Sequence, residues 1–129
     1  MPEQRKKPLL LIVDDDPELV GILVKRLQEL DCEIETASDG HKALEMIRDR
    51  RPDAVVLDVM MPRMNGWEVC KSIKSDEQLS STPVLMLTGI GESLNEITSP
   101  LYGADEYIDK PFDFTELLQK IRRLLGGRV

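Results

Sequence analysis

Short apolar runs alternate with helix-like periodic segments along this chain. The first run, LLLIV, spans residues 9–13, and the leucines at Leu19, Leu23, Leu27 and Leu30 follow it. Their steps of four, four and three predict an amphipathic helix. Four further runs with strand character lie at 32–37, 54–57, 84–87 and 106–109. The pattern predicts five strands that alternate with five helices.

The later helices are indicated by the spacing of their apolar positions. These positions are Ala43, Leu44 and Ile47 in the second helix, Trp67, Cys70 and Ile73 in the third, and Leu117, Leu118, Ile121, Leu124 and Leu125 in the last. The fourth segment, roughly 92–101, is weaker, because Thr98 and Ser99 are poor helix formers and Pro100 ends or kinks a helix. We expect it to be the most mobile helix.

Alternating strands and helices predict an α/β fold with a doubly wound parallel sheet. The runs at 9–13, 54–57 and 84–87 are apolar on both sides, as in central strands covered on both faces. The run at 32–37 alternates and the run at 106–109 is short, so both are expected at edges. The strand order 2-1-3-4-5 satisfies these conditions, and it is the flavodoxin-like order.

Two helix starts carry their own signals. Asp16 followed by Pro17 is typical of an N-cap and the first helical position. Asp113 can cap the last helix in the same way, with Glu116 three residues later. Both caps would fix how a helix leaves the preceding strand end.

Composition narrows the class of protein. The chain has 129 residues, a length that favours one domain. Its formal net charge of -7 argues against nucleic acid as the main partner. Two cysteines without metal-ligand spacing, Cys32 and Cys70, fit a reducing compartment. The first apolar run is too short for a signal peptide or a membrane span. We therefore expect a cytoplasmic protein without membrane association.

Polar residues follow four of the predicted strands at the point where each ends. The first strand runs into Asp14–Asp16, the third into Asp58, the fourth into Thr88 and the fifth into Lys110. In an open parallel sheet the ligand site lies outside the carboxyl ends of the strands, near the switch in winding direction. For the order 2-1-3-4-5 this switch lies between strands one and three. These side chains are therefore expected to meet there.

Three of these acids require compensation if they meet. Two like charges about 5 Å apart repel by roughly 3 kcal/mol at an effective dielectric constant of about 20. Asp14, Asp15 and Asp58 together therefore call for a cation, protonation or both. No histidine or cysteine stands at these strand ends. An all-oxygen ligand set favours Mg²⁺ or Mn²⁺ over Zn²⁺. The plainer interpretation, a helix cap, is preferred only for Asp16.

Four motifs carry a resemblance to a known family. They are IVDDDP at 12–17, VVLDVMMPRMNG at 55–66, VLMLTG at 84–89 and GADEYIDKPF at 103–112. With these spacings the chain resembles the receiver domain of bacterial two-component response regulators, of the chemotaxis-regulator type. The resemblance covers residues 8–125. It leaves 1–7 as an N-terminal tail and 126–129 as a C-terminal tail or the start of a linker.

The resemblance implies a site that accepts a phosphoryl group. Asp58 would be the phospho-acceptor and a Mg²⁺ ligand. Asp15 would bind Mg²⁺ directly, Asp14 directly or through water, and Met60 through its backbone carbonyl. Thr88 would bind a phosphoryl oxygen after transfer. The protein would be a signalling switch with weak autophosphatase activity rather than a turnover enzyme.

The resemblance also implies a mechanism of switching. Lys110 would pair with Asp58 and later with the phosphoryl group, and Tyr107 would turn inward when Thr88 moves. The bond between Lys110 and Pro111 would be cis. The surface of helix 4, strand 5 and helix 5 would then change for a downstream effector or an output domain. The donor would be a sensor histidine kinase or a phosphotransfer protein.

Other interpretations remain. A phosphohydrolase with an aspartyl-phosphate intermediate would want an acid two residues after the nucleophile, where this chain has Met60. In a flavodoxin-like cofactor binder, the acidic segment DDDP at 14–17 would repel the phosphate of the cofactor. A receiver-fold interaction module that works without phosphorylation is the alternative kept. A phosphorylation-dependent dimer also stays open, although the fourth helix has few of the charges that many transcriptional members use for it.

Overall fold

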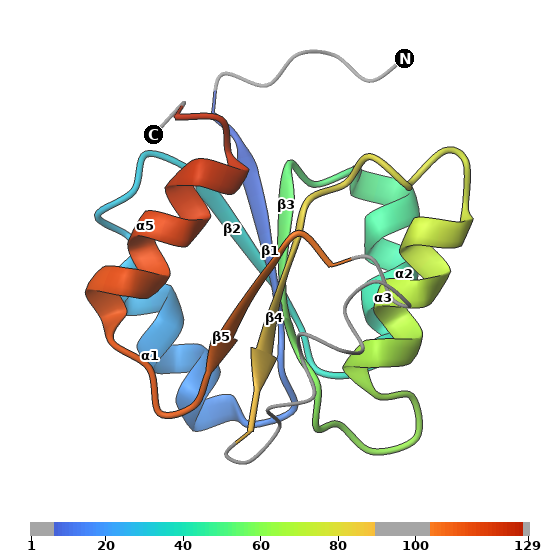
Figure 1. The fold of residues 1–129 in the computed structure, drawn as a ribbon, viewed down its shortest axis with the longest axis horizontal. Helices are drawn as coiled ribbons and strands as arrows, with labels where there is room; N and C mark the ends of the chain where they lie inside the picture. Colours follow the sequence, from blue (N-terminus) through green and yellow to red (C-terminus); the bar gives the residue numbers. More distant parts are fainter. Residues whose placement is uncertain (1–6, 90–103, 128–129) are drawn as a thin grey trace.

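Five parallel strands form the central sheet in the order β2-β1-β3-β4-β5 (Figure 1). The computed structural model describes residues 7–89 and 104–127. The strands are β1 (Leu9–Val13), β2 (Glu33–Ala37), β3 (Ala54–Asp58), β4 (Val84–Thr88) and β5 (Glu106–Asp109). The predicted α/β class and strand order are confirmed.

Helices cover both faces of this sheet (Figure 1). They are α1 (Pro17–Leu27), α2 (Gly40–Arg50), α3 (Gly66–Ser75) and α5 (Phe114–Leu124). α1 and α5 pack on one face around Leu23 and Ile121, and α2 and α3 pack on the other around Ile47 and Ile73. The predicted fourth helix at 92–101 lies outside the described residues. Within the described ranges, no helix has the length and apolar character needed to cross a membrane.

Burial follows the predicted positions of the strands. Every residue of β1, β3 and β4 is buried, whereas β2 and β5 are only partly covered. The central and edge assignments are therefore confirmed. The ends of two helices differ from the prediction. α5 ends at Leu124, and Leu125 is its C-cap. α1 ends at Leu27, and a backbone bond from the amide of Leu30 to the carbonyl of Leu27 closes a turn instead. Leu30 is still buried, so it contributes to the core from outside the helix.

Side-chain caps start each of the four described helices at the carboxyl edge of the sheet. The Asp16 carboxylate accepts the amide of Glu18 at 3.0 Å, and the Asp113 carboxylate accepts the amide of Thr115 at 2.8 Å. The N-terminus of α3 has a full capping box, which Asn65 makes with the third residue of that helix. These caps hold the first turns of α1, α3 and α5 close to the strand ends.

Gly66 brings the start of α3 against the end of β3. A β-carbon built on Gly66 would lie 2.2 Å from the carbonyl oxygen of Asp58 and 2.8 Å from the α-carbon of Val59. The amide of Gly66 also donates to the carbonyl of Val59 at 2.9 Å. Only glycine allows this approach of backbone to backbone. The end of β3, which carries Asp58, is therefore held against the start of α3.

Candidate functional site

Three carboxylates meet where β1 and β3 end side by side. One oxygen from each of Asp14, Asp15 and Asp58 lies within 4.8 Å of the others. Asp14 and Asp58 are each 2% exposed, and Asp15 is open to solvent. The register of β1 on β3 pairs Val13 with Leu57, so the acids follow directly from neighbouring positions. The geometry therefore confirms that the three predicted acids converge.

Asp14 is only partly satisfied by the protein. Its Oδ1 accepts the backbone amide of Asp16 at 2.9 Å. Its Oδ2 is buried without a hydrogen-bond partner among the described residues, and the Lys110 ammonium stands 3.7 Å away. Burial raises the pKa of Asp14 to about 6, and repulsion from Asp58 adds to the effect of burial. The protein thus compensates the negative charge of Asp14 only in part.

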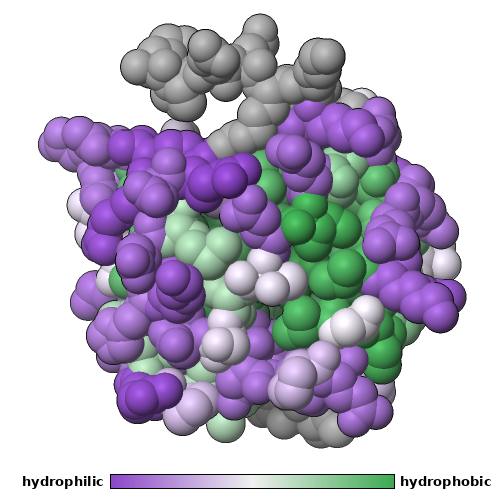
Figure 2. Space-filling view, turned by 180° about the vertical axis from the view of Figure 1, so that it is seen from behind, coloured by the Kyte–Doolittle hydropathy of each residue, from purple (hydrophilic) through white to green (hydrophobic). Residues whose placement is uncertain are grey.

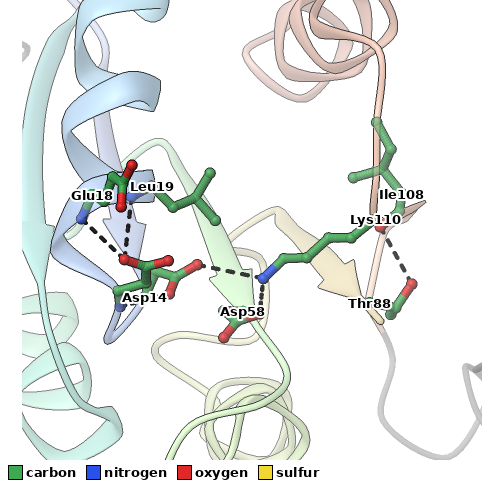
Figure 3. A network of polar contacts seen from close by, with 8 residues as sticks. Asp14, Glu18, Leu19, Asp58, Thr88, Ile108 and Lys110 are labelled. Carbon is green, nitrogen blue, oxygen red and sulfur yellow. Dashed lines mark hydrogen bonds and ion pairs between the residues drawn. The ribbon is translucent and has the colours of Figure 1, made fainter. Parts of the chain in front are cut away.

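Lys110 reaches from the end of β5 to the acids (Figure 3). Its Nζ lies 2.8 Å from Asp58 Oδ1. Burial raises the pKa of Asp58, and the hydrogen bond and charge of Lys110 offset only part of that effect. Burial lowers the pKa of Lys110, but the hydrogen bond and charge of Asp58 outweigh burial and the net shift is upward. The site therefore holds one lysine charge against an excess of carboxylates.

Thr88 and Tyr107 lie on the side of the site formed by β4 and β5. The Thr88 side chain is fully buried, and its hydroxyl donates to the carbonyl of Ile108 at 3.3 Å and to the carboxylate of Asp109. The Tyr107 ring packs on Trp67, with ring centroids 6.1 Å apart, and the phenol oxygen is buried. The Tyr107 ring therefore already contacts α3 in this structure.

Comparison with known proteins decides the family. Residues 10–122 match the family described as the response regulator receiver domain. The chain belongs to this family. The probable transcriptional regulator ycf27 of Guillardia theta is 42% identical to the receiver domain over 119 residues, which are 92% of this chain and 46% of that protein. The receiver domain thus spans about half the length of such relatives.

Solved structures agree with this family. A response regulator structure from Chloroflexus aurantiacus has a TM-score of 0.88 at 34% identity, covering 94% of the receiver domain and 99% of that chain. The receiver domain of a Pseudomonas aeruginosa sensor histidine kinase was solved with a magnesium ion in its active-site cleft. It has a TM-score of 0.83 at 24% identity and covers 93% and 98% of the two chains, so it supports the fold.

The receiver domain brings most of the predicted site residues together. Asp14, Asp15, Asp58 and Lys110 form one cluster, and the Lys110–Pro111 peptide bond is cis as the resemblance implies. Asp16 stands apart from the cluster as the cap of α1. The role predicted for the Met60 carbonyl stays a prediction. The amide of Met60 bonds to Asp58, and its side chain is 66% exposed.

A solvent-open hollow lies beside the acids of the receiver domain. It has a volume of about 530 Å³ and is lined by Asp14 and Asp15, the start of α1, the end of β2 and Lys42 of α2. A second hollow of about 460 Å³ lies over the loop after β3, between Met60 and Trp67. The acidic cluster is therefore reachable from solvent through the first hollow. Figure 2 shows the opposite side of the molecule from Figure 1, where apolar side chains gather in a patch bordered by polar ones.

Sequence reasoning missed two contacts of the site residues. The strand register pairs Thr88 of β4 with Asp109 of β5, and their side chains bond. Trp67 lies in the first turn of α3, and the apolar spacing that predicts this helix does not indicate its contact with Tyr107. The contact between Thr88 and Asp109 could have been predicted by aligning the last residues of the two strands. The second depends on side-chain directions that periodicity does not define.

Proposed function

We propose that this receiver domain accepts a phosphoryl group on the carboxylate of Asp58. The observation that carries the proposal is the buried Asp58 carboxylate, which lies 2.8 Å from the Lys110 ammonium and beside two further acids. A carboxylate removed from water is a better nucleophile, and the fixed lysine charge stabilises an incoming phosphoryl group. A receiver domain acting through Asp58 fits this arrangement.

The reaction is a transfer between two side chains. An oxygen of Asp58 attacks the phosphorus of a phosphohistidine on a histidine kinase or a phosphotransfer protein. The new bond joins that oxygen to phosphorus, and the phosphorus–nitrogen bond to the histidine breaks, so that the neutral imidazole leaves after taking up a proton. The product is an acyl phosphate, whose slow hydrolysis gives weak autophosphatase activity. Positioning supplies most of the rate.

The acids fit a hard divalent cation. The buried Oδ2 of Asp14 has no hydrogen-bond partner among the described residues, and the three carboxylates present only oxygens. Asp14, Asp15, Asp58 and the backbone carbonyl of Met60 would hold Mg²⁺, and Mn²⁺ suits the same donors. The Pseudomonas aeruginosa receiver domain, which has the same fold, was solved with magnesium in its own active-site cleft. When bound, the ion supplies positive charge that offsets the carboxylates and the phosphoryl oxygens.

The remaining residues carry the signal outward. Lys110 keeps its ammonium at Asp58, where it can pair with a phosphoryl oxygen after transfer. Thr88 donates its hydroxyl to that group once the hydroxyl leaves its present partners on β5. Movement of Thr88 and Tyr107 then alters the surface of β5 and α5, which a downstream effector or an output domain recognises. We place this protein in the cytoplasm, where such kinases deliver phosphoryl groups.

Incubation with Mg²⁺ and acetyl phosphate, followed by intact mass spectrometry, tests the proposal. The wild-type chain is expected to gain one phosphoryl group, and Asp58→Asn is expected to gain none. Asp49→Asn, an exposed change on α2, is the matched control and should label as the wild type does. An unlabelled wild type, or equal labelling of Asp58→Asn, would overturn the proposal. Partner binding by an unlabelled wild type would then favour the interaction module.

A further inference from the structure

The hydroxyl of Thr88 has a charged partner at the end of β5. Thr88 and Asp109 are register partners of the parallel strands, and the hydroxyl donates to Asp109 Oδ1 as well as to the carbonyl of Ile108 at 3.3 Å. The Thr88 side chain is fully buried, whereas Asp109 is exposed. The carboxylate therefore engages a buried hydroxyl from the rim of the site.

A threonine hydroxyl has one proton to donate, which the Asp109 carboxylate and the Ile108 carbonyl share in this structure. A carboxylate accepts it more strongly than a backbone carbonyl does, because a charge-assisted hydrogen bond is about twice as strong as a neutral one. A phosphoryl group on Asp58 would need the same proton. Asp109 and the phosphoryl group are therefore two anionic acceptors that compete for one donor.

Asp109, the last residue of β5, and Lys110, which follows it, act on the site in opposite ways. Figure 3 shows the Lys110 ammonium pointing to Asp58, and the Thr88 hydroxyl pointing to the backbone of Ile108 on β5. Lys110 brings a positive charge that favours a phosphoryl group. Asp109 keeps the hydroxyl donor occupied on the β5 side.

We propose that Asp109 is a positioning residue, which holds the Thr88 hydroxyl on the β5 side and so opposes the phosphorylated state of the switch. This inference rests on the proposed function of Asp58. It deepens that function, because the Thr88 hydroxyl must leave Asp109 before it can bind the phosphoryl group. The free energy needed to break that hydrogen bond lowers the stability of the phosphorylated state. Without the Asp109 carboxylate, the hydroxyl turns toward Asp58 at lower cost.

Beryllofluoride with Mg²⁺, a mimic of the phosphoryl group, provides the affinity test. Asp109→Ala is expected to bind this probe about three- to tenfold more tightly than the wild type, because the competing charge-assisted bond is gone. Asp109→Asn, which keeps the shape of the side chain, should show a smaller increase in the same direction. Unchanged or weaker binding by both variants would overturn the role of Asp109.

A double-mutant cycle separates the hydrogen bond from simple charge repulsion. In a Thr88→Ser background the hydroxyl remains, so the effect of Asp109→Ala should persist. In a Thr88→Ala background no hydroxyl competes, and the effect of Asp109→Ala should disappear. An equal effect in the Thr88→Ala background would show that Asp109 acts only through its charge, and the proposal would be wrong.

A measurement without any phosphoryl mimic keeps this inference distinguishable from the function of Asp58. Three-bond couplings of the Thr88 methyl carbon report its χ1 angle by NMR. The wild type is expected to show one rotamer and Asp109→Ala an averaged value, and an unaveraged variant would overturn the positioning role. A wild type that binds no beryllofluoride would instead overturn the phosphoryl-accepting function itself.

Discussion

Acidic side chains lie at both ends of the parallel sheet, but they are satisfied very differently. At the amino edge, Asp53 accepts the amide of Leu9 at 2.7 Å, and Asp105 accepts the amide of Val84 at 2.8 Å. At the carboxyl edge, Asp14 and Asp58 are buried together, and the Asp14 Oδ2 has no hydrogen-bond partner among the described residues. The same residue type thus closes hydrogen bonds at one edge and leaves an acceptor open at the other.

The difference indicates what each edge contributes. At the amino edge the Lys74 ammonium lies 3.0 Å from Asp105 Oδ2 and also donates to two loop carbonyls, so the charges there join α3, β4 and β5. At the carboxyl edge burial raises the pKa of Asp14 to about 6, which is a cost to the folded state without a cation. The charges at the amino edge stabilise the fold. The buried acids at the carboxyl edge lower its stability and leave a carboxylate oxygen available to a ligand.

The largest expected effect on stability comes from adding a side chain where the start of α3 contacts the end of β3. Gly66→Ala places a methyl group 2.2 Å from the Asp58 carbonyl, so we expect a loss of about 4 kcal/mol or more in the free energy of unfolding. Gly21→Ala is the control, since nothing lies within 4 Å of its added methyl and α1 should gain roughly 0.5–1 kcal/mol. Urea denaturation measures both, and equal effects would contradict the close approach.

A smaller loss is expected from the amino edge. Lys74→Met leaves the carbonyls of Ser80 and Thr82 and the carboxylate of Asp105 without this donor, at a cost of about 2 kcal/mol in the free energy of unfolding. Labelling by acetyl phosphate should be unchanged, because the site lies at the other edge. Lys71→Met, an exposed change on the same helix, is the control for urea denaturation. If Lys74→Met lost labelling by acetyl phosphate but kept the stability of the wild type, the proposed separation of a stabilising edge from a functional edge would be wrong.

Removing one charge from the carboxyl edge should have the opposite sign. Asp14→Asn keeps the acceptor for the amide of Asp16 but cannot ionise. With divalent cations removed by a chelator at pH 7.5, its free energy of unfolding should therefore be about 2 kcal/mol higher than that of the wild type. Mg²⁺ should stabilise the wild type and not the variant.

The pH dependence of this gain follows from the raised pKa of Asp14. The folded wild type binds more protons than the unfolded chain between pH 3.8 and about 6, so its stability falls as pH rises through that window. The advantage of Asp14→Asn should therefore be absent below about pH 4 and complete above about pH 7. Urea midpoints at pH 4, 5, 6 and 7.5 measure it, and a constant difference would contradict the assignment.

The smallest effect is expected at the cap of α1. Asparagine caps a helix about as well as aspartate, so Asp16→Asn should change stability by only a few tenths of a kcal/mol. Its Mg²⁺ affinity, measured by calorimetry, should stay close to that of the wild type. Asp15→Asn should lose about tenfold or more, because it removes a carboxylate of the cluster. Equal losses in the two variants would place Asp16 in the metal site.

Much of the fold could be predicted because burial leaves a direct record in the sequence. The runs that became β1, β3 and β4 are apolar on both sides, and the predicted fifth strand has the bounds of β5, Glu106–Asp109. The end of α1 could not be predicted from periodicity, since Leu30 continues the leucine spacing and is buried from a turn. Periodicity records which side chains are buried and leaves open which backbone conformation buries them.

The site could be predicted as far as topology determines it. Parallel strands bring their carboxyl ends together, so the convergence of Asp14, Asp58 and Lys110 followed from strand order. The direction of the Thr88 hydroxyl could not be predicted, because it depends on a rotamer and on which acceptor, here Asp109, lies nearby. Strand order thus predicts which residues meet, and the packed structure is needed to show which atoms bond.

The contact between Trp67 and Tyr107 gives the chain an optical reporter. Trp67 is the only tryptophan in the sequence, and its ring lies 6.1 Å from that of Tyr107 at an angle of 40°. Indole emission depends on the polarity and packing of its surroundings. In the proposed switching mechanism Tyr107 moves, which would alter this contact and is expected to shift the indole emission. Tryptophan fluorescence of the unlabelled protein, recorded with and without a phosphoryl mimic, measures that shift.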